Sequence, residues 1–154
     1  MRLPAAIPLS GVSDIEPSRL LIGVYTSEVP PNLNVSLLTT CQNKIQPCLL
    51  GSFIVDNQSS ASALRDLKRH QERGDRITLA PDVRGYLLEA TQQTSPYGFS
   101  TMMWQQGGMI YTISFSAIER QNLLFMAQSM VNGQPIYRRS SPPTPSIGIG
   151  SPRL

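Results

Sequence analysis

The sequence predicts an α+β domain, in which an antiparallel twisted sheet of about six or seven strands carries one C-terminal helix on one face. Three observations predict this fold class. Short β-favouring runs recur along the chain, 13 prolines and 11 glycines separate them, and one capped amphipathic stretch lies near the end. The 154 residues are enough for a single core but too few for two ordinary domains.

The first half of the chain predicts three strands. Residues 19–27 (RLLIGVYTS) form a β-favouring run that ends before two prolines, and residues 34–40 (NVSLLTT) are the expected antiparallel neighbour. Residues 49–56 (LLGSFIVD) form the third strand, in which Gly51 marks a bulge or a close backbone approach. The first two runs therefore form a hairpin, and the third strand follows the second.

A charged stretch interrupts the strands. Residues 61–73 are expected to form a marginal surface helix that starts at Ser60 or Ser62 and stops at Gly74. Side chains of both signs indicate a solvated face, and His70 is expected on that face. The apolar stripe of this helix has only three members, namely Ala63, Leu64 and Leu67.

Two further hairpins are expected in the second half. A Pro-Asp turn joins residues 77–80 to residues 83–90, where Gly85 relieves a steric conflict. Residues 99–105 and 109–115 are joined across a Gly-Gly pair, which is a strong hairpin signal. Alternation in the last strand predicts one buried face, made by Met109, Tyr111, Ile113 and Phe115.

A helix is expected over residues 116–131. Ser116 and Glu119 have the spacing of a capping box, and Gly133 is placed to end the helix. Apolar residues recur at three- and four-residue spacing, so this stripe is expected to pack on the sheet. A stripe that carries methionine also suits a partner-binding groove, although core packing is favoured in a domain of this size. The stripe consists of Leu123, Leu124, Ala127, Met130 and Val131.

The two ends of the chain differ in composition from the middle. Residues 1–18 are expected to be an extended segment, residues 19–137 a single α+β domain, and residues 138–154 a disordered tail rich in Pro, Ser and Gly. Arg138 and Arg139 open this tail and are candidates for docking to a partner. Three residues of the first segment, Ile7, Leu9 and Ile15, are expected at the edge of the domain.

The charge distribution argues against a nucleic-acid partner. The formal net charge is +3, but Arg138, Arg139 and Arg153 lie in the tail, and residues 1–137 hold ten basic and ten acidic side chains. The expected folded part therefore has no basic surface from which counterion release gives affinity. No run approaches the roughly 20 apolar residues that a membrane span needs, so no span is expected.

Cys41 and Cys48 are the only cysteines, with six residues between them. A disulfide across this loop is feasible and stabilises a fold by about 2–2.5 kcal/mol in the chain-entropy model. Such a bond indicates an oxidising compartment, whereas two buried free thiols suit the cytoplasm. Because residues 1–21 lack the features of a signal peptide, export predicts a leader or anchor outside this sequence. Only His70 is available to join the cysteines, so neither a metal nor a cofactor is expected.

Catalytic motifs are not evident. The sequence has no G-x-S-x-G elbow, and its single histidine limits a Ser-His-acid triad to His70. A small hydrolase would need His70 to meet a buried carboxylate and a serine. We therefore expect a noncatalytic protein.

Short motifs follow one another in an order that carries a family resemblance. They are Arg2-Leu3-Pro4, the turn from Cys41 to Cys48 with Leu49-Leu-Gly-Ser-Phe53, Val83-Arg-Gly-Tyr86, Trp104-Gln-Gln-Gly-Gly-Met-Ile-Tyr111 and Ala127-Gln-Ser129. Over about residues 2–132 the chain resembles a family of small, apparently exported cyanobacterial domains without an established function. It departs from them at Gln128, where an Asn-like residue is expected, in the longer charged stretch and in the tail. The resemblance implies an extracytoplasmic location and a disulfide, and it brings no catalytic residue.

The expected function is therefore that of a noncatalytic cell-envelope domain, periplasmic or extracellular, that binds a partner protein or a surface component. The alternative is an accessory subunit or assembly factor of a larger membrane-associated or intracellular complex, which allows a cytoplasmic location. For Trp104 the interpretation as a core or hairpin-packing residue is favoured over partner binding. The oligomeric state is not predicted. The aromatic candidates for partner binding are Tyr86, Tyr97, Trp104 and Tyr111.

Overall fold

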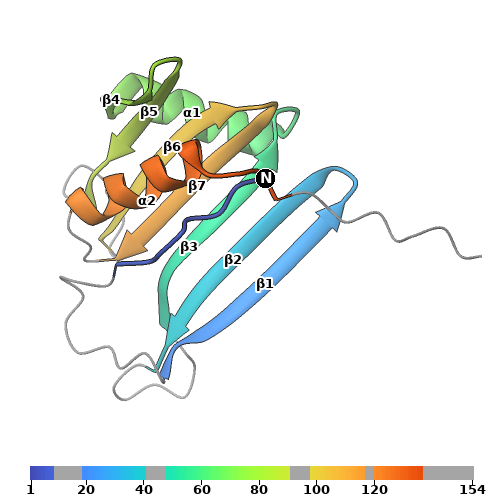
Figure 1. Ribbon diagram of the computed structural model, residues 1–154, viewed down its shortest axis with the longest axis vertical. Coiled ribbons are helices and arrows are strands. Elements are labelled where there is room, and N and C mark those ends of the chain that lie inside the picture. The colour runs from blue at the N-terminus through green and yellow to red at the C-terminus, as the bar shows by residue number, and fades with distance from the viewer. Residues whose placement is uncertain (9–18, 41–47, 91–97, 117–119, 137–154) are drawn as a thin grey trace, which may run out of the picture.

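The computed structural model describes residues 1–8, 19–40, 48–90, 98–116 and 120–136 (Figure 1). One antiparallel sheet and two helices make up this part of the chain, and one helix is C-terminal, which confirms the predicted fold class. The strands are β1 (Leu21–Glu28), β2 (Pro31–Thr39), β3 (Cys48–Asn57), β4 (Asp75–Ala80), β5 (Val83–Leu88), β6 (Phe99–Gln106) and β7 (Met109–Ser116). The helices are α1 (Ala61–Arg73) and α2 (Arg120–Asn132).

The sheet joins two meanders. Its strand order is β1-β2-β3-β7-β6-β5-β4, and all neighbouring strands are antiparallel. The pairing of β3 with β7 connects the meander β1-β2-β3 to the meander β4-β5-β6-β7. As a result, β1 and β4 are the two edges of the sheet.

The helices lie on opposite faces of the sheet (Figure 1). In β6, Met102 and Trp104 belong to the apolar cluster under α2, whereas Met103 between them packs with α1. This alternation follows from the two-residue period of a strand. The sequence predicted a helix on only one face, but α1 covers part of the other.

Helix α1 has the predicted bounds and a buried stripe that differs from the predicted one. The side chain of Ser60 accepts from the backbone N–H of Ala63 at 3.4 Å, which confirms the N-cap. The prediction that His70 lies on the solvated face is wrong, because His70 is only 2% exposed. It lies seven positions after Ala63, on the stripe that faces the sheet, whereas Leu64 points to solvent.

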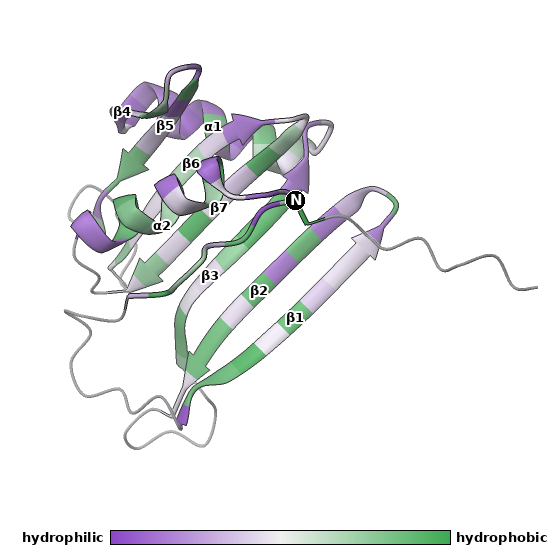
Figure 2. Ribbon diagram, in the orientation of Figure 1, coloured by the Kyte–Doolittle hydropathy of each residue, from purple (hydrophilic) through white to green (hydrophobic). Residues whose placement is uncertain are grey.

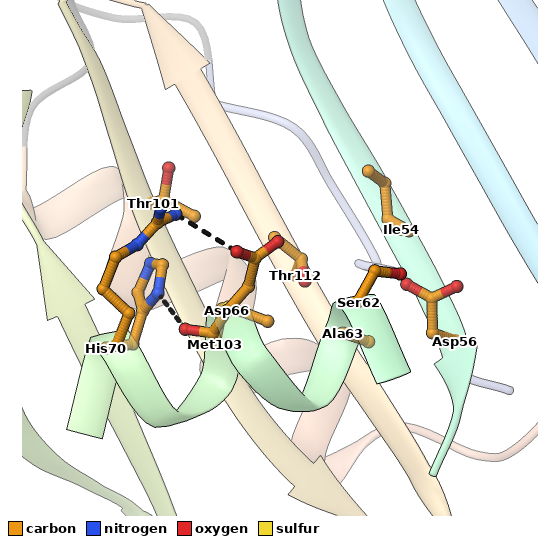
Figure 3. Close-up of a pocket in the computed structure, with 10 residues that line it drawn as sticks. Ile54, Asp56, Ser62, Ala63, Asp66, His70, Thr101, Met103 and Thr112 are labelled. Atoms are coloured by element: carbon orange, nitrogen blue, oxygen red, sulfur yellow. Dashed lines mark hydrogen bonds and ion pairs between the residues drawn. The ribbon is translucent and has the colours of Figure 1, made fainter. Parts of the chain in front are cut away.

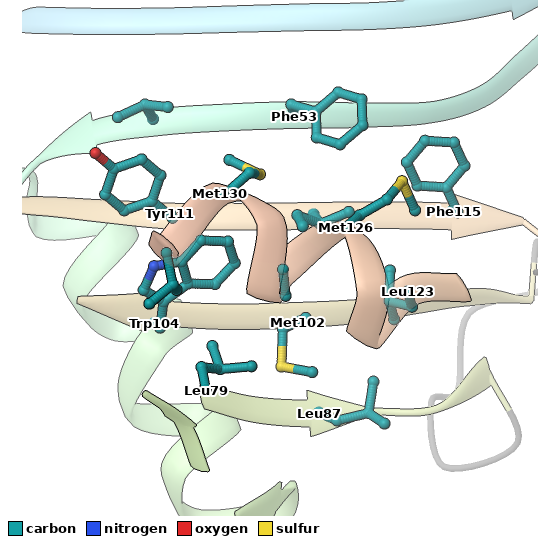
Figure 4. Close-up of a cluster of buried hydrophobic side chains, with 14 of the residues drawn as sticks. Phe53, Leu79, Leu87, Met102, Trp104, Tyr111, Phe115, Leu123, Met126 and Met130 are labelled. Atoms are coloured by element: carbon teal, nitrogen blue, oxygen red, sulfur yellow. The ribbon is translucent and has the colours of Figure 1, made fainter. Parts of the chain in front are cut away.

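The main core lies between α2 and the sheet (Figure 4). Its aromatic side chains pack in two pairs. Trp104 and Tyr111 stack with ring centroids 5.2 Å apart, and Phe53 meets Phe115 edge-on at 5.4 Å. Helix α2 contributes five buried residues to the core, namely Leu123, Met126, Ala127, Met130 and Val131. Four of them belong to the predicted stripe; Met126 was not predicted, and the predicted Leu124 is less buried. Of the predicted capping box, Glu119 lies outside the described residues.

Residues 1–8 pack against this core, although they form neither helix nor strand. The guanidinium of Arg2 donates hydrogen bonds to the backbone carbonyls of Val131, at 3.0 Å, and of Gly133. These carbonyls end α2, where a positive charge also interacts favourably with the helix dipole. The apolar contacts come from Met1, Leu3 and Ile7, whereas Leu9 and Ile15 lie outside the described residues.

Two glycine predictions are confirmed. Leu50 is an extra residue in β3, because Leu37 pairs with Gly51 and Leu38 with Leu49. A Cβ on Gly51 would lie 2.4 Å from the Phe115 ring, so the site is both a bulge and a close approach. The β6–β7 turn uses its Gly-Gly pair at φ of +58° and +76°, as a tight hairpin requires.

Candidate functional site

The hairpin of β1 and β2 extends beyond the part of the sheet that the helices cover (Figure 1). The main contacts of α1 are with β4 to β7, and those of α2 are with β4, β6 and β7. Every residue of β1 is exposed except Gly23, which is half-buried. We call this hairpin, Leu21–Thr39, the uncovered ribbon.

Strand β1 contains several hydrophobic residues (Figure 2), and their large apolar side chains are exposed. The register places Ile22 and Val24 on the face that α2 covers elsewhere, where they are 63% and 57% exposed. Leu21 and Tyr25 lie on the opposite face and are 54% and 68% exposed. An edge strand of an antiparallel sheet normally packs such side chains against a core on at least one face, but no described helix or strand covers either face of β1.

The two edges of the sheet are built differently. Strand β4 has six residues, begins with Asp75 and Arg76, and has a register irregularity near Thr78, all of which hinder pairing with another chain. Strand β1 has eight residues, contains neither Lys nor Pro, and has Glu28 at its end as its one charged residue. Among the described residues, therefore, one edge is protected and the other has no strand beside it.

A groove of about 570 Å³ lies at the turn end of the uncovered ribbon. Met1, Leu33 and Ile136 contribute its apolar wall, and residues 26–28 contribute the edge of β1. The backbone N–H of Ile136 donates to the carbonyl of Met1 at 2.7 Å, which holds the two ends of the described chain beside the ribbon. The groove and the open edge together form one continuous surface.

The three sequence-predicted aromatic residues that the structure describes lie away from this surface. Trp104 and Tyr111 are fully buried in the core, and Tyr86 is half-buried against the α1 cluster. This burial raises the pKa of Tyr111, and the nearby Arg2 lowers the same pKa by a smaller amount. Trp104 thus occupies the position that the core interpretation predicted.

Several predicted residues fall outside the described part of the chain. These are Cys41, Tyr97, Arg138 and Arg139. Cys48 is the first residue of β3, and its pairing with Cys41 stays a prediction. Sequence reasoning missed two exposed aromatic residues, Tyr25 in β1 and Phe125 in α2. The signal for Tyr25 was a strand with apolar residues at both even and odd positions and no charge before Glu28.

Among the residues that the structure describes, His70 does not make the contacts of a catalytic triad. Its Nδ1 lies 2.8 Å from the backbone carbonyl oxygen of Asp66, while the Asp66 carboxylate pairs with Arg69 at 3.4 Å. Burial lowers the pKa of His70. The hydrogen bond to the backbone of Asp66 raises this pKa, and the positive charge of Arg69 lowers it. Within the described residues, no three His, Cys, Asp or Glu side chains gather closely enough to hold a metal ion.

The fold and the surface define a small α+β domain whose antiparallel sheet has one unprotected edge. Comparisons with protein-family models, with curated proteins and with solved structures found no match. Neither described helix has the length and apolar character needed to cross a membrane.

Proposed function

We propose that this protein is a noncatalytic cell-envelope domain that binds a partner protein along strand β1. The observation that carries the proposal is the contrast between the protected edge at β4 and the open, apolar edge at β1. An open edge strand is a template for pairing, and proteins that do not use such an edge usually block it.

The partner is expected to add an extended segment beside β1. Backbone hydrogen bonds along the edge give affinity in this mode of recognition, and alternate side chains of the added strand enter neighbouring pockets. On one face the added strand meets Ile22 and Val24, and at its end it reaches the groove beside Met1 and Ile136. An apolar, uncharged strand suits this surface, because each buried charge without a partner costs free energy.

The substitution Val24→Lys tests this function. Val24 lies in the middle of β1 and is largely exposed, so the change is expected to alter the free energy of unfolding by less than about 0.5 kcal/mol. A paired strand at this edge would bury the introduced ammonium, so partner affinity is expected to fall at least about tenfold. The measurement is capture from an envelope extract of the native host, followed by titration of the purified partner.

The matched control is Thr78→Lys, which places the same side chain on an exposed position of the other edge strand. It is expected to bind the partner as the unmodified chain does. Equal capture of the same proteins by the Val24 variant would contradict binding at β1. Sedimentation of the chain alone shows whether a second copy is the partner.

The envelope location rests on the cysteine pair and on the family resemblance. We expect no free thiol in the protein purified from its native host, because Cys41 and Cys48 would be joined in an oxidising compartment. The measurement is maleimide labelling under denaturing, non-reducing conditions, with a reduced sample as the control for two reactive thiols. Two free thiols before reduction would contradict the envelope location. This outcome would not contradict partner binding at β1.

A further inference from the structure

A second cavity lies on the opposite side of the sheet from α2, between α1 and strands β3, β6 and β7 (Figure 3). Its volume is about 150 Å³. The sheet contributes hydroxyl groups from Thr101 and Thr112, and the helix contributes Ser62, Asp66 and His70. None of these residues belongs to the uncovered ribbon, so the cavity is independent of the proposed partner surface.

The imidazole of His70 has a defined tautomer. A carbonyl oxygen only accepts hydrogen bonds, so Nδ1, which lies 2.8 Å from the carbonyl oxygen of Asp66, must carry the proton. Burial lowers the pKa and keeps the ring neutral. The other nitrogen, Nε2, is therefore a bare acceptor.

The Nε2 atom is buried and lacks a hydrogen-bond partner in the described part of the chain, although the side chain lines the cavity. A buried polar atom without a partner costs free energy and is rare in folded proteins. Thr101 lies near the ring in Figure 3, but its Oγ1 forms a hydrogen bond with the hydroxyl of Ser114 at 2.7 Å and none with Nε2. A donor from outside the chain would satisfy Nε2.

The charges around the cavity limit what this donor is. Asp66 and Asp56 line the cavity, and so does Arg69, which pairs with the Asp66 carboxylate. The Asp66 carboxylate is already paired with Arg69, and the Asp56 carboxylate already accepts a hydrogen bond from the Asn32 side chain, so a neutral ligand suffices and no counter-ion is required of it. Hydroxyl groups both donate and accept, which matches a wall of carboxylates, a guanidinium and hydroxyls.

The size of the cavity limits the ligand further. An apolar cavity of about 150 Å³ in another protein holds one benzene molecule, so this cavity accommodates about six non-hydrogen atoms. Glycerol has this number of atoms and three hydroxyl groups. Unlike the benzene cavity, this one has mostly polar lining residues, with Ile54, Ala63 and Met103 as the apolar exceptions.

We propose that this cavity binds a small neutral polyol, with one hydroxyl group of the ligand donating to Nε2 of His70. Thr112 and Ser62 are placed to bond the remaining hydroxyls, because they line the same cavity and neither residue is buried. The proposal adds a small-molecule site to a domain whose other surface binds protein.

Glycerol is the probe, and the imidazole nitrogens of the full-length ¹⁵N-labelled protein are the readout. The chain has one histidine, so its two ring nitrogens are assigned without ambiguity. Glycerol is expected to shift the Nε2 resonance along a saturable curve and to leave the Nδ1 resonance nearly unchanged. Thr112→Val is expected to weaken this binding at least fivefold, whereas Thr78→Val, on the exposed part of β4, leaves it unchanged.

1-Propanol, which has the three-carbon chain of glycerol and one hydroxyl group, is the matched control ligand. It is expected to give at most a weak, unsaturated change. A linear response to glycerol, equal curves for the two variants, or equal saturation by 1-propanol would overturn the proposal. The first outcome indicates a cavity that holds only water, and the last indicates a site that recognises volume rather than hydroxyl groups.

Discussion

Trp104→Ala is expected to lower the free energy of unfolding by about 3–5 kcal/mol, which is the cost of truncating a large buried aromatic side chain. Trp104 has no exposed surface, and its ring stacks on Tyr111 at an interplanar angle of 6°. The substitution leaves a cavity beneath α2 that neighbouring rigid elements cannot fill. Urea denaturation followed by circular dichroism measures the loss.

Trp104→Phe provides the comparison, because it retains a ring against Tyr111. Nε1 of Trp104 is buried and lacks a hydrogen-bond partner among the described residues, so phenylalanine also removes an unsatisfied donor. We expect a loss below about 2 kcal/mol, which is closer to a conservative core substitution. If alanine instead left stability unchanged and abolished partner binding, Trp104 would be a binding residue rather than a core residue.

The sequence correctly predicted the structural features that depend only on residues close together in the chain. The Gly-Gly turn, the Ser60 N-cap and the bulge at Gly51 each depend on a few neighbouring residues, and the structure has them where the sequence placed them. The bounds of α1 follow for the same reason, because a cap at each end fixes a helix of this length.

The features that sequence reasoning missed depend on strand order and on distant contacts. Trp104 and Tyr25 are both aromatic residues in strands, but β6 lies within the sheet and β1 lies at its edge, so one is buried and the other exposed. His70 is buried because α1 crosses the sheet, which its mixed charges do not indicate. Arg2 bonds to Val131 across 129 positions in sequence, and no local pattern predicts such a contact.

Gly51→Ala is expected to destabilise the protein by about 3 kcal/mol, near the upper range for overpacking a core. The added Cβ would lie 2.4 Å from Cδ1 of Phe115, whose ring is fully buried and is held edge-on against Phe53. The ring cannot move aside without disturbing that pair. Thermal and urea unfolding of the variant measure the loss.

Two further variants separate this clash from a general effect of alanine in a strand. Gly23→Ala in β1 would bring the new Cβ no closer than 3.5 Å to Tyr25, so its effect is expected within about 0.5 kcal/mol. Adding Phe115→Leu to the Gly51 variant is expected to recover at least about 1 kcal/mol relative to the sum of the single changes, because the residues are in contact. Equal losses at Gly51 and Gly23, or additive effects with Phe115, would contradict the clash.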